Sequence, residues 1–245
     1  MRLALISDIH GNLTALEAVL ADIAQRQIKE IICLGDVSTG GPHPREVLRR
    51  IQALDCPVVM GNNDDWVLSP RLRDCTTQTA QNNQDINLWC TQQHTKADKD
   101  FIRTFHPNIS WPLPNGKILL FYHGSPRSFS EFIVPTTPNE IFEEAFAGFE
   151  ADIFIGGHSH MQMFRRYRKK IVINPGSIGR AMDRVFPLEE VRHSPWAEYA
   201  ILTIEDGGLS VEHRHVQFDI HAFIRDIHTS GMPHAQWLVD KWNLH

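Results

Sequence analysis

The chain lacks any run of roughly eighteen consecutive apolar residues, so we expect no transmembrane helix. It also lacks a secretory apolar segment, because Asp8 and His10 interrupt the first apolar run near the N-terminus. The four cysteines show no CxxC spacing and favour free thiols. We therefore expect a cytoplasmic protein with no membrane partner.

Neither charge dominates, since 24 lysines and arginines stand against 29 acidic residues, for a net charge of −5. This balance argues against a large nucleic-acid footprint. The basic run at 165–170 lies between two strand-like runs and is better explained as a solvent-exposed hairpin. No G-x-S-x-G elbow is present, so nothing indicates a protein nucleophile.

Apolar runs and amphipathic segments alternate along the 245 residues and predict an α/β protein. We expect helices at 13–26, 44–54, 138–149, 218–228 and 235–243, and late strands at 163–168, 171–174, 199–204 and 209–217. We expect one domain, 1–245, interrupted by a Gln-, Asn- and Thr-rich insertion at 66–107 that forms two or three helices. This insertion follows Asn62 and Asp64, so it is either a cap over a site there or a solvated decoration.

Five short polar motifs each stand at the end of an apolar run that reads as a buried strand. They are Asp8 with His10, Asp36, Asn62, His123, and His158 with His160. Ligands of open α/β sheets bind beyond the carboxyl ends of the strands. We therefore expect the seven side chains to converge at one sheet edge and to form a two-metal site.

The residue types indicate which metals such a site would hold. Carboxylate, amide and imidazole together offer oxygen and nitrogen ligands, and imidazole favours zinc, iron, manganese or related ions over calcium and magnesium. Two such ions can activate water and bind phosphoryl oxygens.

The ordered motifs DIH, GD, GNND, HG and GHSH strongly resemble those of the calcineurin-like metallophosphoesterase superfamily. The opening MRLALISDIHGNLTALEAVLADI and the later INPGSIG are similar to its small bacterial and archaeal branch. The resemblance runs from Arg2 to about residue 220. It implies a four-layer αββα sandwich of two mixed β-sheets flanked by helices.

The resemblance also assigns roles to the motif residues. One metal would be held by Asp8, His10, Asp36 and His160. The other would be held by Asp36, Asn62, His123 and His158, so that Asp36 bridges both. The cofactor would be two divalent transition metal ions (Mn, Fe, Zn or Ni), with manganese favoured, and hydrolysis would proceed by attack of a metal-bound hydroxide. Asp36, Asn62, Asn63 and Asp64 are the expected catalytic residues.

One position departs from the family, which usually has a histidine where this chain has Asn63. An amide donates a hydrogen bond but transfers no proton at neutral pH. We therefore expect weak turnover of esters with basic leaving groups, unless His94 or His106 supplies the acid. Asn63 and Arg127 are the expected substrate-binding residues.

Weaker candidates surround these motifs. The turn at 174–177 is expected to buttress the site, with Ser177 or Arg180 near the substrate, and His43 is expected to be a surface loop residue.

The function that these patterns favour is hydrolysis of a phosphodiester or nucleotide polyphosphate. The partner would be a small phosphorylated substrate, nucleotide-like in structure. The alternatives are a phosphomonoesterase or protein phosphatase, or a non-catalytic binding protein on the same fold. The sequence leaves the oligomeric state open.

Overall fold

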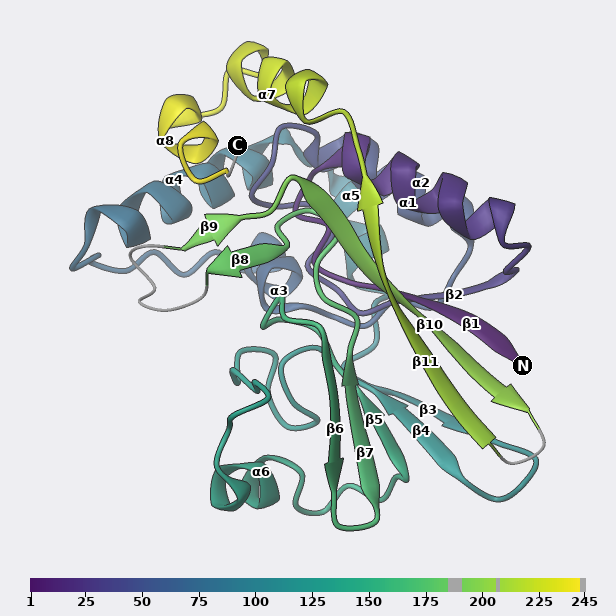
Figure 1. Cartoon of the computed structure of the whole chain (residues 1–245). Helices are drawn as coiled ribbons and strands as arrows, with labels where there is room; N and C mark the ends of the chain where they lie inside the picture. The colour runs from purple at the N-terminus through teal and green to yellow at the C-terminus, as the bar shows by residue number, and fades with distance from the viewer. Residues whose placement is uncertain (185–190, 206–207, 243–245) are drawn as a thin grey trace.

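Two β-sheets pack face to face at the centre of the computed structural model, which describes residues 1–184, 191–205 and 208–242 (Figure 1). The first sheet has the order β11-β10-β1-β2. Its strands are β1 (Arg2–Ile6), β2 (Glu30–Cys33), β10 (Trp196–Glu205) and β11 (Gly208–Gln217). β1 is parallel to β2 and antiparallel to β10, so the sheet is mixed.

The second sheet has the order β3-β4-β5-β7-β6. Its strands are β3 (Ile109–Pro112), β4 (Ile118–Phe121), β5 (Ile153–Ile155), β6 (Met163–Tyr167) and β7 (Lys170–Asn174). The three inner strands are parallel and the two edge strands antiparallel. β6 and β7 form a hairpin that contains the basic run at 165–170, as the sequence predicts. β8 (Met182–Arg184) and β9 (Arg192–His193) form a separate ribbon.

The alternation of side chains along β1 shows how the layers are built. Leu3 and Leu5 point into the core between the two sheets, whereas Ala4 and Ile6 belong to the core under the helices. Because neighbouring residues of a strand face opposite sides, a strand buried on both sides must be apolar throughout. All four of these side chains are fully buried.

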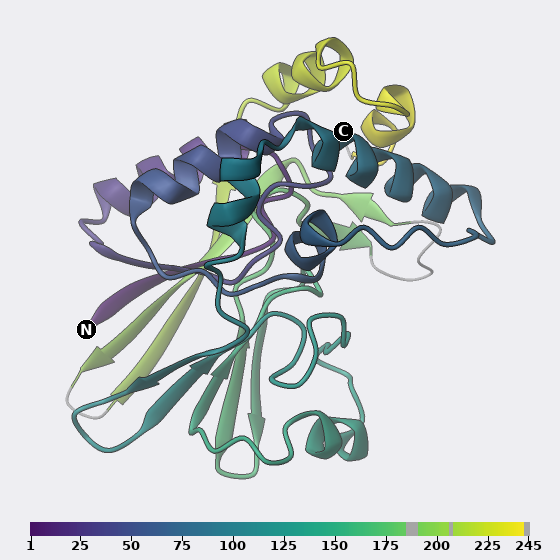
Figure 2. The same cartoon turned by 180° about the vertical axis from the view of Figure 1, so that it is seen from behind.

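Helices cover both outer faces of the sandwich (Figures 1 and 2). The first sheet carries α1 (Leu13–Gln25), α2 (Pro44–Leu54), α7 (Ile220–Thr229) and α8 (Ala235–Val239). The second sheet carries α6 (Asn139–Ala145), whose Phe142 packs with Phe154 in a third core cluster. This is the expected four-layer arrangement. Residue 243 of the helix predicted at 235–243 lies outside the described residues.

α1 shows why the helices begin where they do. The Asn12 side chain accepts a hydrogen bond from the backbone N–H of Ala15 at 3.0 Å, which caps the first turn. Leu16, Val19 and Ile23 then recur at helical spacing and are buried against the first sheet.

The insertion at 66–107 extends this helical layer. α3 (Asn62–Leu68) begins just before it, and α4 (Gln78–Gln93) and α5 (Lys96–Ile102) lie within it. Ile86, Cys90 and Ile102 are fully buried and belong to the same core cluster as β1 and α1. No helix in the described ranges is long and apolar enough to cross a membrane.

This continuous core predicts that the insertion unfolds together with the rest of the chain. Ile86→Ala should lower the free energy of unfolding by about 2–4 kcal/mol in a single denaturant transition, because it leaves a cavity in a fully buried site. The matched control is Ile141→Ala on α6, where the side chain is 50% exposed and the loss should stay below about 1 kcal/mol. Two separate transitions would contradict the single-domain assignment.

Candidate metal centre

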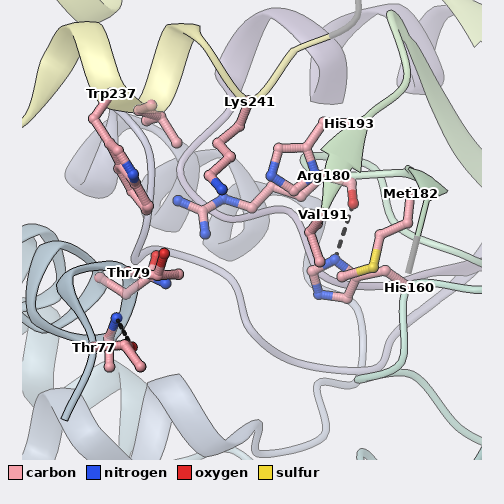
Figure 3. A pocket seen from close by; sticks show the side chains of 12 residues that line it. Thr77, Thr79, His160, Arg180, Met182, Val191, His193, Trp237 and Lys241 are labelled. Carbon is pink, nitrogen blue, oxygen red and sulfur yellow. Dashed lines mark hydrogen bonds between the residues drawn. The ribbon is translucent and has the colours of Figure 1, made fainter. Parts of the chain in front are cut away.

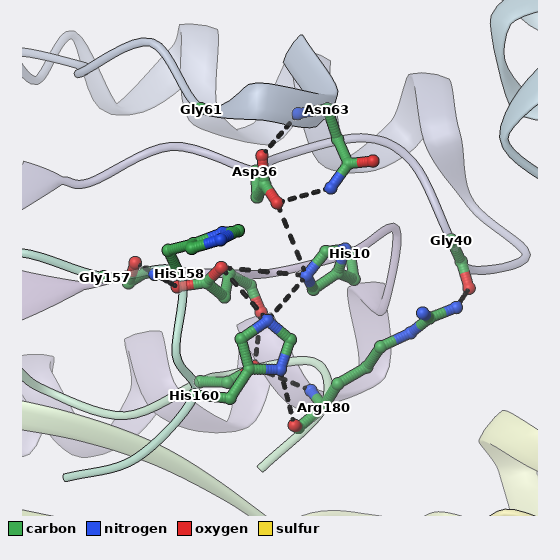
Figure 4. Close-up of polar contacts among 12 residues, drawn as sticks. His10, Asp36, Gly40, Gly61, Asn63, Gly157, His158, His160 and Arg180 are labelled. Carbon is green, nitrogen blue, oxygen red and sulfur yellow. Dashed lines mark hydrogen bonds and ion pairs between the residues drawn. The ribbon is translucent and has the colours of Figure 1, made fainter. Parts of the chain in front are cut away.

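The structure brings all seven predicted side chains together beyond the carboxyl ends of β1, β2, β4 and β5. Figure 4 shows four of them, His10, Asp36, His158 and His160. The loops after β1, β2, β4 and β5 and the start of α3 supply them. They form two adjoining groups. The first consists of Asp8, His10 and His160, and the second of Asp36, His123 and His158, with ligand atoms in each group within 4.8 Å of one another.

Asn62 joins the second group through His123. Its side-chain oxygen lies 3.1 Å from His123 Nε2. His123 Nε2 also lies 3.5 Å from Asp36 Oδ1. An amide oxygen, a carboxylate and an imidazole therefore point at one space.

Asp36 faces both groups with different oxygens. Its Oδ1 is the atom nearest His123, and its Oδ2 lies 3.8 Å from His10 Nε2 in the first group. This is the placement that a bridging carboxylate requires.

Backbone carbonyls determine which histidine nitrogens face the centre. Nδ1 of His10, His123 and His160 donates to the carbonyl oxygens of Thr39, Leu34 and Arg180, at 3.1, 2.6 and 2.9 Å respectively. A carbonyl can only accept, so each Nδ1 carries a proton, and each ring in its neutral form presents its Nε2 lone pair inward. Metal-binding histidines are commonly oriented in this way.

Two features test whether these residues fit a cation. Nε2 of His10 and Nε2 of His160 lie 3.0 Å apart, so two lone pairs would face each other with no proton between them. Asp8 Oδ1 is buried and has no hydrogen-bond partner among the described residues, although it lies 3.1 Å from His160 Nε2. A divalent ion between these atoms would satisfy all of them, so the residues fit a metal centre.

The electrostatics of the centre also favour a bound cation. Burial opposes a charge on His123, but Asp36 and Asp8 outweigh it and raise its pKa to about 10. The same carboxylates attract a divalent cation, which competes with the proton for Nε2.

Backbone strain is concentrated at these candidate ligands. Five of them have left-handed backbone conformations, with positive φ angles at Asp8 (53°), His10 (49°), Asp36 (52°), His158 (65°) and His160 (55°). Each such residue costs about 1–2 kcal/mol relative to a right-handed conformation. The loops tolerate this because the chain is held on both sides; for example, the His10 N–H donates to the Asp36 carbonyl at 3.0 Å.

Two glycines allow the loops to approach this closely. A Cβ at Gly61 would lie 2.2 Å from Asp36 Oδ1, and one at Gly157 would lie 2.1 Å from Ser7 Oγ. Neither position can accept a side chain without moving a ligand or its support.

Asn63 connects the centre to the insertion. Its backbone N–H and its side-chain amide donate to the two oxygens of Asp36, at 2.8 and 2.5 Å. Its side-chain oxygen accepts a hydrogen bond from Asn87 on α4 at 2.9 Å. Asn63 thus orients the shared carboxylate, and Asn87 orients Asn63.

Asp64 holds the loop that carries Asp36. The Asp64 carboxylate is fully buried and accepts hydrogen bonds from the backbone N–H groups of Asp36, Val37 and Gly61, at 2.8, 3.0 and 3.0 Å. These contacts give it a positioning role; its assignment as a catalytic residue stays a prediction.

Arg127 lies at the surface and pairs with Glu131 and Glu144. A substrate phosphate would compete with these carboxylates, and substrate binding by Arg127 also stays a prediction.

The two histidines considered as alternative acids lie in different surroundings. His94 hydrogen-bonds Ser38 at 3.0 Å, and burial lowers its pKa to about 4. His106 is exposed.

A cavity adjoins each end of the centre. One, of about 400 Å³, is lined by His160 and Arg180 and by residues of α4, β8, β9 and α8 (Figure 3). The other, of about 280 Å³, is lined by Asn62, Trp66 and Asn87 among others. The sequence patterns missed His193, Trp237 and Lys241 in the larger cavity as site residues, because each stands far along the chain from any ligand motif.

The strained backbone predicts an unusual order of stabilities. In the presence of a chelator, the free energy of unfolding should be about 1 kcal/mol higher for His160→Gly than for His160→Ala, because glycine adopts positive φ without strain. At His123, where φ is not positive, the alanine variant should be at least as stable as the glycine variant. The same order at both positions would show that strain is not the cause.

Comparison with known proteins agrees with this geometry. A model of the calcineurin-like phosphoesterase superfamily domain matches residues 1–207. The chain is 29% identical to the uncharacterized protein MJ0912 of Methanocaldococcus jannaschii over 98% of this chain and 96% of that protein.

Solved structures show the same fold. A metallophosphoesterase from Sphaerobacter thermophilus is 25% identical, with a TM-score of 0.76 over 98% of this chain and 97% of that one. The hypothetical protein PH1004 from Pyrococcus horikoshii OT3 is 18% identical, with a TM-score of 0.78 over 98% and 96%. The chain therefore belongs to the calcineurin-like phosphoesterase superfamily, and its activity is that of a metal-dependent hydrolase of phosphoric esters.

Proposed function

We propose that the protein uses a binuclear metal centre to hydrolyse a phosphodiester or a nucleotide polyphosphate in the cytoplasm. The observation that carries the proposal is the pair of ligand groups that face each other across Asp36. The four free cysteines support a reducing compartment.

Each residue of the centre has a part in this activity. Asp8, His10 and His160 would hold one ion and Asn62, His123 and His158 the other, with Asp36 shared. Bound divalent ions neutralise phosphate charge and lower the pKa of water. Two ions carry four positive charges against the two carboxylates of Asp8 and Asp36, so the centre attracts anions although the chain as a whole is acidic. Among manganese, iron, zinc and nickel, we favour manganese.

The two cavities support a substrate with groups on both sides of the reacting phosphorus. A monoester would need only one of them, whereas a diester or a polyphosphate would occupy both. A nucleotide-like substrate is the small-molecule class that fits this arrangement.

Asn63 affects which leaving groups the enzyme can expel. Its amide already donates to Asp36, and it has no proton to transfer at neutral pH. A phosphorylated or aryl leaving group needs no strong acid, so this residue supports polyphosphates and activated diesters over simple alkyl esters. The same residue is the observation that favours the competing proposal of a non-catalytic binding protein.

Hydrolysis of bis(p-nitrophenyl) phosphate tests the proposal. Chelator-stripped protein should be inactive and should gain activity with manganese. His123→Ala should lower that activity about a hundredfold or more and reduce the bound manganese from about two ions per chain. The matched control is His228→Ala, an exposed histidine on α7.

Failure with manganese would call for the same assay with iron, zinc and nickel and with p-nitrophenyl phosphate as a monoester. Activity on the monoester alone would replace the proposal by a phosphomonoesterase. No activity with any of these metals would leave the binding protein as the better description.

A second prediction concerns the absent acid. Asn63→His should raise turnover of an alkyl phosphodiester by about 10–100-fold, because general acid catalysis is worth ~10²–10⁴-fold, and should change bis(p-nitrophenyl) phosphate turnover much less. Asn63→Ala is the control, since it also frees Asp36 but adds no proton donor. Equal gains in both variants would refute proton transfer as the reason.

A further inference from the structure

We propose that the cavity beside His160 binds the nucleobase and the unattacked phosphate of a nucleoside polyphosphate, an inference that rests on the proposed function. The cavity measures about 400 Å³, within the range of ~300–1,000 Å³ typical of small-molecule sites. It shares His160 with the metal centre, so a molecule bound there reaches the reacting phosphate.

Charge is the first observation. Arg180 and Lys241 both line the cavity, and none of its described lining residues is acidic. Figure 3 shows both side chains directed into the same space. Burial lowers the pKa of Arg180 to about 10, which still leaves the guanidinium charged at neutral pH. Two cations among the described residues of a partly enclosed space favour an anion such as phosphate.

The second observation is an unused hydrogen-bonding atom. His193 lines the same cavity and is 6% exposed, and its Nδ1 has no hydrogen-bond partner among the described residues. Trp242 packs beside its ring, with centroids 5.3 Å apart, and the His193 N–H donates to the Lys241 carbonyl at 2.8 Å. A buried polar atom without a partner is unfavourable, and a ligand oxygen or hydroxyl would relieve it.

Arg180 ties this anion site to the metal centre. Its carbonyl accepts the Nδ1–H of His160, and its guanidinium donates to the Gly40 carbonyl, next to the Thr39 carbonyl that orients His10. The cationic group is therefore held in a fixed relation to two ligands of the first metal. A second phosphate on Arg180 would fix the position of the first phosphate at the centre.

The rest of the cavity suits a flat aromatic group. Trp237 lines it together with Met182, Val191 and Leu238. Thr77, the N-cap of α4, and Thr79 in its first turn lie on another side (Figure 3). Lys241 Nζ lies 5.4 Å from the centre of the Trp237 ring. A base stacked on Trp237 and a phosphate on Lys241 would thus be close neighbours, as they are in a nucleotide.

The cavity beside Asn62 is a poorer candidate for the charged group. It is lined by Arg71 and Arg73, but Arg71 is paired with Asp65 at 2.8 Å and the cavity is smaller, at about 280 Å³. We therefore assign the nucleobase and the unattacked phosphate to the His160 side.

Binding to metal-free protein tests this cavity without relying on turnover. Titration calorimetry in the presence of a chelator should show ADP binding about tenfold tighter than adenosine, because charged hydrogen bonds to one phosphate are worth at least that factor. Lys241→Gln should remove most of this preference, and Lys241→Arg should retain it. Trp237→Ala should lower the affinity for both ADP and adenosine. Lys29→Gln, at an exposed site, is the control.

Equal binding of ADP and adenosine, binding of neither, or an unchanged preference in Lys241→Gln would overturn the inference. A turnover ratio separates this failure from that of the proposed function. For the manganese-loaded enzyme, kcat/KM for ADP divided by kcat/KM for bis(p-nitrophenyl) phosphate should fall about tenfold in Lys241→Gln. An active enzyme with an unchanged ratio refutes only the cavity assignment, whereas an inactive protein with the ADP preference intact refutes only the hydrolase.

Discussion

The structure of the site depends on one buried carboxylate, that of Asp36, which is 1% exposed. Both of its oxygens accept hydrogen bonds from Asn63, and they face His10 and His123 in the two ligand groups. Asp64 holds its backbone in place. A negative charge buried this deeply is unfavourable by itself, so its position depends on the surrounding donors and histidines.

The rigid sandwich is what allows such a loop arrangement. Five of the candidate ligands keep left-handed backbone conformations because the strands before them are buried on both faces and cannot shift. The left-handed residues lower the stability of these loops, and the burial of apolar side chains on both sides of the sheets offsets that loss. The ends of β1, β2, β4 and β5 therefore form a preorganised frame in which the ligand nitrogens and oxygens already point at common positions.

Elements that contribute no metal ligand build the walls around this frame. α4 supplies Asn87, which orients Asn63 on one side, and Thr79, which lines the cavity on the other. β9 and α8 complete the larger cavity with His193 and Trp237. The candidate metal ligands thus come from strand ends, whereas the cavity walls come from the insertion and the C-terminal segments.

The sequence by itself determined the strand ends, the ligand types and the family, because a buried strand and a following polar motif are local patterns. It placed α2 at 44–54, as observed, and α1 within one residue of its end, since capping and apolar spacing are local too. Only the tertiary structure decided the partners of exposed charges, as with Arg127 and its two glutamates. It alone also decided that Lys241 and Trp237 stand beside His160, because contacts between segments about eighty residues apart depend on how the layers pack and leave no periodic signal in the chain.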